Sequence, residues 1–272
     1  MAEAVMDSFS PLPPTETRIL DLGRSKLALF YYGPDEGEGA KAAEWIARVV
    51  AQVASSARSP PDYLEVHIYS SEELMRALTA LEELRRGVVA SAEFDVFHEA
   101  WSGIPRIHIA LDKLRAVDRS TAEALIAHEV VHAALHGSPE FYTVAADLSS
   151  TASVLALYIA AVALKDLEVY TEMVRTPSLR ERLVTLKRYW EKALPEAACN
   201  TPEDIANLSK ALALYAALGE NVAEARIRDS CRSAAETLYS SLARIRDTAD
   251  RPWNLLEVFA EAVAKALQEV RS

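Results

Sequence analysis

Cysteine is scarce in this chain, and the cysteines that are present form no metal-binding pattern. Only two, Cys199 and Cys231, occur among 272 residues, and they lack the paired spacing of a zinc finger. If the chain turns near Gly219 to form a helical hairpin, Cys199 lies level with a residue well beyond Cys231, so we expect no disulfide. Two scattered cysteines, together with no visible signal peptide after Met1, favour a cytoplasmic protein.

Basic residues are also fewer than acidic ones. The chain has 29 lysines and arginines against 40 aspartates and glutamates, which gives a formal net charge of −11. A surface of this sign repels the phosphates of nucleic acids and the headgroups of anionic membranes. We therefore expect no nucleic-acid partner and no association with a membrane surface.

The chain has little that could span a membrane. Residues 148–164 are uncharged for 17 positions, but four of these positions are serine or threonine. A membrane helix needs about 20 predominantly apolar residues. The segment therefore predicts a buried core helix.

What is abundant is apolar residues, at 50% of the chain, enough for one large core or two modest ones. Residues 1–16 form a proline-rich lead, 17–119 alternate between strand and helix patterns, and 120–272 are helical in pattern throughout. Strands are predicted at 18–22, 26–32, 63–69, 94–101 and 106–111, and helices at 40–54, 71–86, 202–218, 221–247 and 253–270. The predicted fold class is therefore α+β, with an N-terminal mixed sheet and its helices, then a helix from about residue 120, then an all-helical C-terminal part.

One pentapeptide, His128-Glu129-Val130-Val131-His132, carries most of the chemical information. Residues four apart share a face of a helix, so His128 and His132 can bind one metal ion. Ser120 and Glu123 form a capping-box pattern that predicts Ser120 as the N-cap of this helix. The rest of the helix is apolar nearly all round and therefore buried, where two histidines and a glutamate need partners. A metal ion supplies such a partner; the alternative is a core helix whose histidines and glutamate form ordinary hydrogen bonds.

The pattern H-E-x-x-H on a helix resembles the signature of the zincin metallopeptidases. The resemblance implies Zn²⁺ as the cofactor, His128 and His132 as two of its ligands, Glu129 as the general base, and a peptide or protein as the substrate. Two other functions stay open. One is a non-catalytic metal-binding or interaction protein on a zincin-like scaffold, and the other is a helical interaction protein with a chance motif.

A third ligand is needed, because catalytic zinc takes three protein ligands and one open position. His136 does not fit, since eight helical residues separate it from His128 by about 12 Å along the axis. Some zincins take a third histidine from H-E-x-x-H-x-x-G-x-x-H, but here Leu135 and Ser138 occupy the glycine and third-histidine positions. We expect His136 instead to interact at the C-terminus of the helix, which Gly137 follows.

A carboxylate further along the chain is the remaining choice. The spacing Glu168-x-x-x-Glu172 resembles the E-x-x-x-D of the glutamate-zincins, the thermolysin-like enzymes and their relatives. The resemblance implies Glu168 as the third ligand and Glu172 as a hydrogen-bond partner of a ligand histidine. Asp166 is a further candidate in the same segment.

Reaching Glu168 requires a bend in the chain. Ser138 and Pro139 predict the start of a second helix, and a straight helix would place Glu168 about 43 Å from that start. The serine- and threonine-rich segment 149–153 is the predicted bend. Without that bend, Glu140 or Asp147 becomes the better ligand.

The resemblance also implies a substrate-binding edge strand before the active-site helix, to which a peptide adds as a further strand. We predict residues 104–111 as this strand, with Arg106 and His108 on one face and Ile107 and Ile109 on the other. His108 is expected to be an ordinary histidine on the surface of the sheet. The donor that would stabilise a tetrahedral oxyanion stays open among Tyr142, Tyr158, Tyr170, His98 and His108.

Overall fold

The sheet and the C-terminal helices of this chain belong to two different units. The computed structural model describes residues 12–57, 59–86, 96–142, 153–194, 198–248 and 250–271. Unit 1 comprises Met1–Ser138 and contains a five-stranded mixed sheet; unit 2 comprises Pro139–Ser272 and is helical. The fold is therefore α+β, as predicted. The boundary follows α4 (Arg119–His136), so the helix that carries His128 and His132 is part of unit 1.

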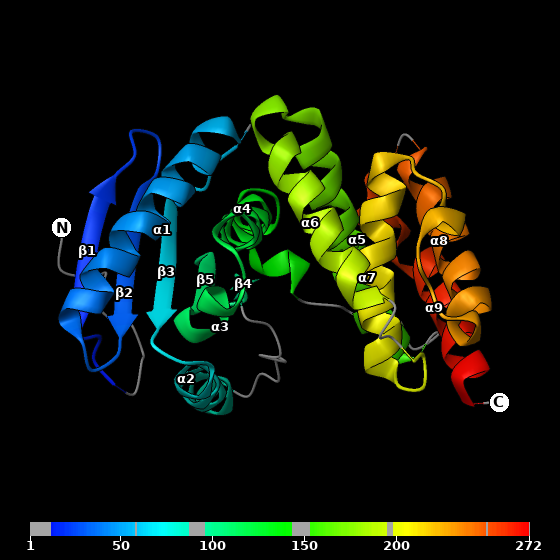
Figure 1. The fold of residues 1–272 in the computed structure, drawn as a ribbon, viewed down its shortest axis with the longest axis horizontal. Helices are drawn as coiled ribbons and strands as arrows, with labels where there is room; N and C mark the ends of the chain where they lie inside the picture. Colours follow the sequence, from blue (N-terminus) through cyan, green and yellow to red (C-terminus); the bar gives the residue numbers. More distant parts are fainter. Residues whose placement is uncertain are drawn as a thin grey trace. The chain divides into compact units, whose positions relative to one another are not determined.

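The sheet of unit 1 has the strand order β1-β2-β3-β5-β4 (Figure 1). Its central pairs β2–β3 and β3–β5 are parallel, whereas β1 and β4 pair antiparallel at the two ends. The strands are β1 (Glu16–Asp21), β2 (Lys26–Tyr32), β3 (Tyr63–Tyr69), β4 (Val96–Glu99) and β5 (Arg106–Ala110). Helices α1 (Glu36–Ser56), α2 (Glu72–Arg86) and α3 (Leu111–Ala116) connect or follow them.

Alternation along the strands assigns the two faces of the sheet. Leu64 of β3 lies with Val50 of α1 and Val130 of α4 around one small apolar pocket, so α1 and α4 cover this face. Tyr69, five residues along β3, points the other way and packs with Met75 of α2. Both faces of β2 and β3 are therefore buried, and β2 is apolar or aromatic at every position after Lys26.

The strand at the edge of the sheet beside α4 is not the predicted one. β5 pairs with β3 on one side and with β4 on the other, so residues 104–111 do not form an edge. Within the described strands, β4 is the end strand on this side, and it packs against α4. The error arose because β4 precedes β5 in the sequence but lies outside it in the sheet.

The face covered by α2 holds a cluster of carboxylates, histidines and one arginine, most of them buried. We call Glu65, His67, Glu82, Glu99, Arg106 and His108 the Arg106 cluster. Arg106 Nε donates to Glu65 Oε2 at 2.8 Å, and its Nη1 donates to Glu82 Oε1 at 2.6 Å and lies 3.7 Å from Glu99 Oε1. The Arg106 side chain is only 4% exposed, so these carboxylates supply the partners that a buried guanidinium requires.

His67 continues this cluster as a neutral imidazole. The Tyr32 hydroxyl lies 3.2 Å from His67 Nδ1, and His67 Nε2 lies 3.2 Å from Glu65 Oε2. A neutral ring with its proton on Nε2 accepts from the tyrosine and donates to the glutamate. Burial lowers the pKa of His67, and the bond to Glu65 opposes that shift only in part. Burial alone would raise the pKa of Glu65, but the bond from His67 and the charge of Arg106 lower it.

His108 repeats the arrangement on the next strand. The Tyr69 hydroxyl lies 2.9 Å from His108 Nδ1, and His108 Nε2 lies 3.3 Å from Glu99 Oε1. His108 is 1% exposed, so the prediction of a surface histidine is wrong. For Glu99, burial again opposes ionisation, but the bond from His108 and the nearby Arg106 lower the pKa. The prediction assumed that this face of the sheet is exposed to solvent. Helix α2 covers it instead.

Unit 2 is built around α5 (Val154–Arg175), whose Ser153 N-cap accepts from the Ala156 amide. The buried face of α5 packs against α6, α7 and α9. The other helices of this unit are α6 (Arg180–Ala193), α7 (Pro202–Leu218), α8 (Arg232–Arg246) and α9 (Leu256–Arg271), with short turns η1 (Pro139–Phe141), η2 (Pro177–Leu179), η4 (Val222–Glu224), η5 (Asp229–Cys231) and η6 (Pro252–Leu255). Over the part of the chain that is described, no helix is both long enough and apolar enough for a membrane span.

Cys199 and Cys231 form a disulfide, which contradicts the expectation of none. The predicted helix over 221–247 is instead interrupted by two short turns, and α8 begins only at Arg232. These turns bring Cys231 to the residue just before α8, within 5.4 Å (Cα–Cα) of Cys199. Disulfides are usual in oxidising compartments and in the cytosol of some hyperthermophiles, so the cytoplasmic location stays a prediction.

Candidate metal centre

The helix α4 begins two turns before the first histidine of the motif. Its N-cap is Asp118, not Ser120, because the Asp118 carboxylate accepts from the Thr121 amide at 3.0 Å. The Ser120 hydroxyl also donates to Asp118, so Ser120 supports the cap without forming it. Hydrogen bonds from Ser120 and Thr121 hold the pKa of Asp118 well below its usual range. The cap therefore stays charged at the positive end of the helix dipole.

Apolar packing holds α4 in place. Ala124, Ile126, Ala127, Val130 and Val131 are buried, as the sequence predicts. A polar contact adds to this packing, since Trp45 Nε1 of α1 donates to Glu123 Oε1 at 3.1 Å. The rotation of α4 about its axis is thereby fixed, and with it the direction of the histidines.

His128 and His132 converge at their Nε2 atoms, which lie 3.0 Å apart. Their exposed fractions are 9% and 8%, and the two rings are nearly perpendicular, at 83°. Two nitrogens bound to one tetrahedral zinc, each at 2.0–2.1 Å, would be about 3.3 Å apart. The pair therefore fits the spacing of two imidazole ligands without rearrangement of the helix.

Glu129 lies beside this pair. Its Oε1 is 3.9 Å from His128 Nε2, and its side chain is 14% exposed. The carboxylate is therefore at the same end of the His128 ring as the nitrogen that faces His132. A group in this position can exchange a proton with a water molecule held near the two Nε2 atoms.

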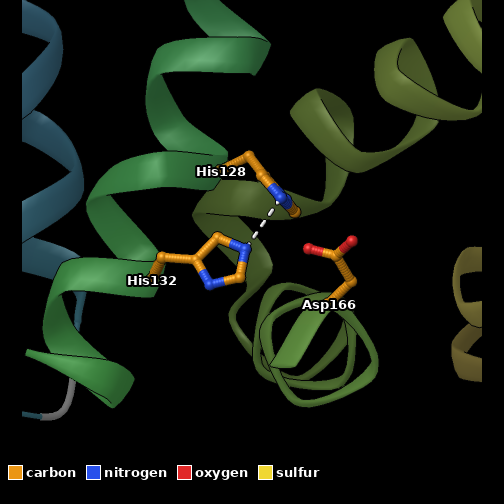
Figure 2. A group of neighbouring side chains, drawn as sticks. All are labelled: His128, His132 and Asp166. Atoms are coloured by element: carbon orange, nitrogen blue, oxygen red, sulfur yellow. Dashed lines mark hydrogen bonds between the residues drawn. The ribbon is translucent and has the colours of Figure 1, made fainter. Parts of the chain in front are cut away.

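Within the described residues, one group of side chains could hold a metal ion: His128, His132 and Asp166. Each offers one ligand atom, and these atoms all lie within 4.8 Å of one another (Figure 2). All three residues are buried, and Asp166 is 4% exposed. Asp166 comes from α5, two residues before Glu168, and is the alternative ligand that the sequence offers in this segment.

Glu168, the predicted third ligand, has other partners in unit 2. Arg251 Nε donates to Glu168 Oε1 at 3.2 Å, and Arg251 Nη2 donates to Oε2 at 3.2 Å. The Trp253 amide also donates to Oε1 at 3.2 Å. Because two helical residues differ by about 200° around the axis, Glu168 and Asp166 point to opposite sides of α5. At most one of them can face a given metal ion, and Glu168 stays a prediction.

The remaining carboxylate candidates are less well placed. Glu172, the expected hydrogen-bond partner of a ligand histidine, accepts a long hydrogen bond from the Thr176 hydroxyl at 3.5 Å. Glu140 is exposed in η1, the short turn at which the helix predicted from Ser138 would begin. Asp147 and the predicted bend at 149–153 fall largely outside the described residues, which resume at Ser153.

All six histidines of the chain lie in unit 1. Two belong to the Arg106 cluster, and four, His98, His128, His132 and His136, lie on α4 or beside it. His98 is on β4, and its ring stacks against that of His132 with centroids 6.1 Å apart. His136 is fully buried, and its Nδ1 lies 3.2 Å from His132 Nδ1.

The candidate oxyanion donors have different surroundings in the structure. His108 is buried in the Arg106 cluster, on the face of the sheet that α2 covers. The Tyr170 hydroxyl accepts from Trp190 Nε1 at 3.2 Å inside unit 2. Tyr158 is 46% exposed, and the Tyr142 ring lies 4.2 Å from the Lys165 ammonium. His98 is therefore the candidate that lies next to a motif histidine within one unit.

No protein-family model, no curated protein and no solved structure matches this chain.

Proposed function

We propose that this chain binds a zinc ion and hydrolyses peptide bonds. The observation that carries the proposal is the 3.0 Å separation of the Nε2 atoms of His128 and His132, with the Glu129 carboxylate 3.9 Å from the first of them. A purely structural site has no use for an adjacent carboxylate, whereas a hydrolytic site needs a base there.

For the third ligand we propose Asp166. Its ligand atom belongs to the group that lies within 4.8 Å, whereas the oxygens of Glu168 already accept from Arg251 and Trp253. Two histidines and one carboxylate are a donor set that catalytic zinc sites use.

Each group would then have a separate role in hydrolysis. When bound, zinc would polarise the scissile carbonyl and lower the pKa of water toward about 7. Glu129 accepts the proton of the attacking water and delivers it to the leaving amine. An extended peptide that pairs with the edge strand β4 passes beside His98, whose ring can donate a hydrogen bond to the carbonyl oxygen.

The metal is tested first. We expect the purified protein to carry about one zinc ion per chain, measured by elemental analysis after dialysis. His128→Ala together with His132→Ala should remove it, because both imidazole ligands are lost. Unchanged zinc content in this double variant would refute the site.

Hydrolysis is tested with Glu129→Gln, which keeps the shape of the side chain but cannot accept a proton. We expect this variant to retain zinc and to lose at least about 10²-fold in cleavage of a mixed peptide library. Zinc in the wild-type protein without any cleavage would instead favour a non-catalytic metal-binding protein. Normal turnover of the variant would place the base elsewhere.

A further inference from the structure

We infer that His136 is a positioning residue for His132, an inference that rests on the proposed zinc site. The Nδ1 atoms of the two rings lie 3.2 Å apart, and His136 is fully buried one helical turn after His132. His136 thus meets the nitrogen of His132 that faces away from His128. It cannot bind the same ion as His132 Nε2, and its contact is the kind that fixes a ligand ring from behind.

The contact determines which nitrogens carry protons. His132 Nε2 lies 3.0 Å from His128 Nε2 and is the nitrogen proposed to bind zinc. A neutral imidazole that uses Nε2 as a ligand carries its proton on Nδ1. His132 Nδ1 then donates to His136 Nδ1, so His136 must hold its own proton on Nε2.

This arrangement replaces the one that the resemblance implies. There the partner of a ligand histidine is a carboxylate from the E-x-x-x-D segment, which Glu172 would supply. Here the neutral imidazole of His136, on the same helix, accepts the hydrogen bond from His132 Nδ1. The partner of this ligand histidine is therefore a residue of unit 1 and not a carboxylate of α5. His136 therefore contributes to the orientation of His132 from the same helix, at spacing i, i+4.

The test compares two substitutions of one side chain. His136→Leu fills the space but removes the acceptor, whereas in His136→Asn the amide oxygen can accept from His132 Nδ1. Zinc affinity is measured by competition with a chelator, using Zn²⁺ alone as the probe. We expect a 10–100-fold loss for His136→Leu, as for other partners of ligand histidines, and recovery to within a few-fold for His136→Asn. His108→Asn is the control, a buried histidine of the same unit, and should leave the affinity unchanged.

Three results would be decisive. Failure of the wild-type protein to bind zinc would overturn the proposed function itself. Zinc binding by the wild type with equal affinity in His136→Leu would overturn only the role of His136. Equal losses in His136→Leu and His136→Asn would also overturn it, because packing rather than hydrogen bonding would then be the cause.

A spectroscopic measurement keeps the inference testable even if a variant does not fold. In wild-type protein labelled with ¹⁵N at histidine and loaded with zinc, we expect His132 to carry its proton on Nδ1 and His136 on Nε2. A proton on Nδ1 of His136 would contradict the proposal, since two Nδ1–H groups cannot bond to each other. Cobalt(II) in place of zinc gives a second readout, with a changed visible spectrum in His136→Leu and a wild-type spectrum in His136→Asn.

Discussion

At the scale of single residues, the neighbouring carboxylates Asp166 and Glu168 are expected to play different parts. Asp166 belongs to the group of side chains that could hold a metal ion, whereas Glu168 accepts two hydrogen bonds from Arg251 and a further one from the Trp253 amide. The Glu168 side chain is 8% exposed and that of Arg251 is 46% exposed, so this ion pair is partly open to solvent. Its loss should affect the stability of unit 2 more than it affects the metal.

Asp166→Asn and Glu168→Gln form a matched pair of variants. We expect Asp166→Asn to weaken zinc binding strongly, because it removes a charged ligand. Glu168→Gln should bind zinc nearly as well as wild type but lose about 1–3 kcal/mol of stability, the range for weakening hydrogen bonds to a charged group. Chelator competition and urea unfolding measure the two effects. The opposite pattern would restore Glu168 as the ligand.

His98 is tested with His98→Phe, which keeps a ring beside His132 but removes both nitrogens. Zinc content should not change, since His98 is not one of the three proposed ligands. If His98 stabilises the oxyanion, kcat should fall about 10²–10³-fold. Unchanged kcat in a zinc-loaded His98→Phe protein would show that the donor is another residue or a backbone amide.

At the scale of helices and strands, local signals predict the elements better than their pairing. The bounds of β2, β3 and α7 were predicted from apolar runs, turn residues and a proline at the start of α7. The placement of β5 between β3 and β4 was missed, because strand order depends on contacts between distant segments. The N-cap of α4 was misplaced by two residues because Asp118 and Ser120 are both good caps.

The proposed metal ligands differ in the same way. Residues on one helix are predicted from local spacing, but a ligand from a distant segment is not. Spacing alone places His128, Glu129 and His132 on one helix, and the resemblance to the zincins implies the roles proposed for them. The third ligand depends on which side of α5 each carboxylate faces, and Asp166 and Glu168 are too close in sequence for spacing to separate them. The Arg106 cluster was missed because its members come from four elements, α2, β3, β4 and β5.

The disulfide gives a prediction for unit 2. It closes a loop between residues 32 apart in sequence, a length for which cross-linking stabilises by about 3–4 kcal/mol in the chain-entropy model. Replacing Cys199 and Cys231 by serine, or reducing the wild-type protein, should therefore lower the thermal midpoint by similar amounts. The double-serine variant should not respond to reductant. Two alkylatable thiols in the denatured, unreduced wild-type protein would show that the bond does not form.

At the scale of the whole molecule, the Arg106 cluster should make the stability of unit 1 depend on pH. The folded pKa values of Glu65 and Glu99 are lowered from 4.5, so the unfolded state takes up protons first as pH falls. The folded pKa of His67 is lowered from 6.5, which acts in the same direction. Stability should therefore be full above pH 6.5, decline below it, and fall more steeply below about pH 4.5.

Tryptophan fluorescence can follow this dependence. Trp45 and Trp101 are in unit 1, so replacing Trp190 and Trp253 by phenylalanine leaves reporters of unit 1 only. Urea unfolding between pH 4 and pH 8 should show the decline. His67→Gln should flatten the part between pH 5 and pH 6.5, because glutamine does not titrate. A stability that does not change between pH 5 and pH 7.5 would contradict the role assigned to His67.

The distribution of the histidines has a practical consequence for following the protein in solution. Because all six lie in unit 1, a sample labelled only at histidine yields signals from that unit and is silent about the other. Zinc should divide these signals into two sets. The four rings on and beside α4 should shift on titration, while those of His67 and His108, which lie across the sheet, should stay in place and serve as an internal reference.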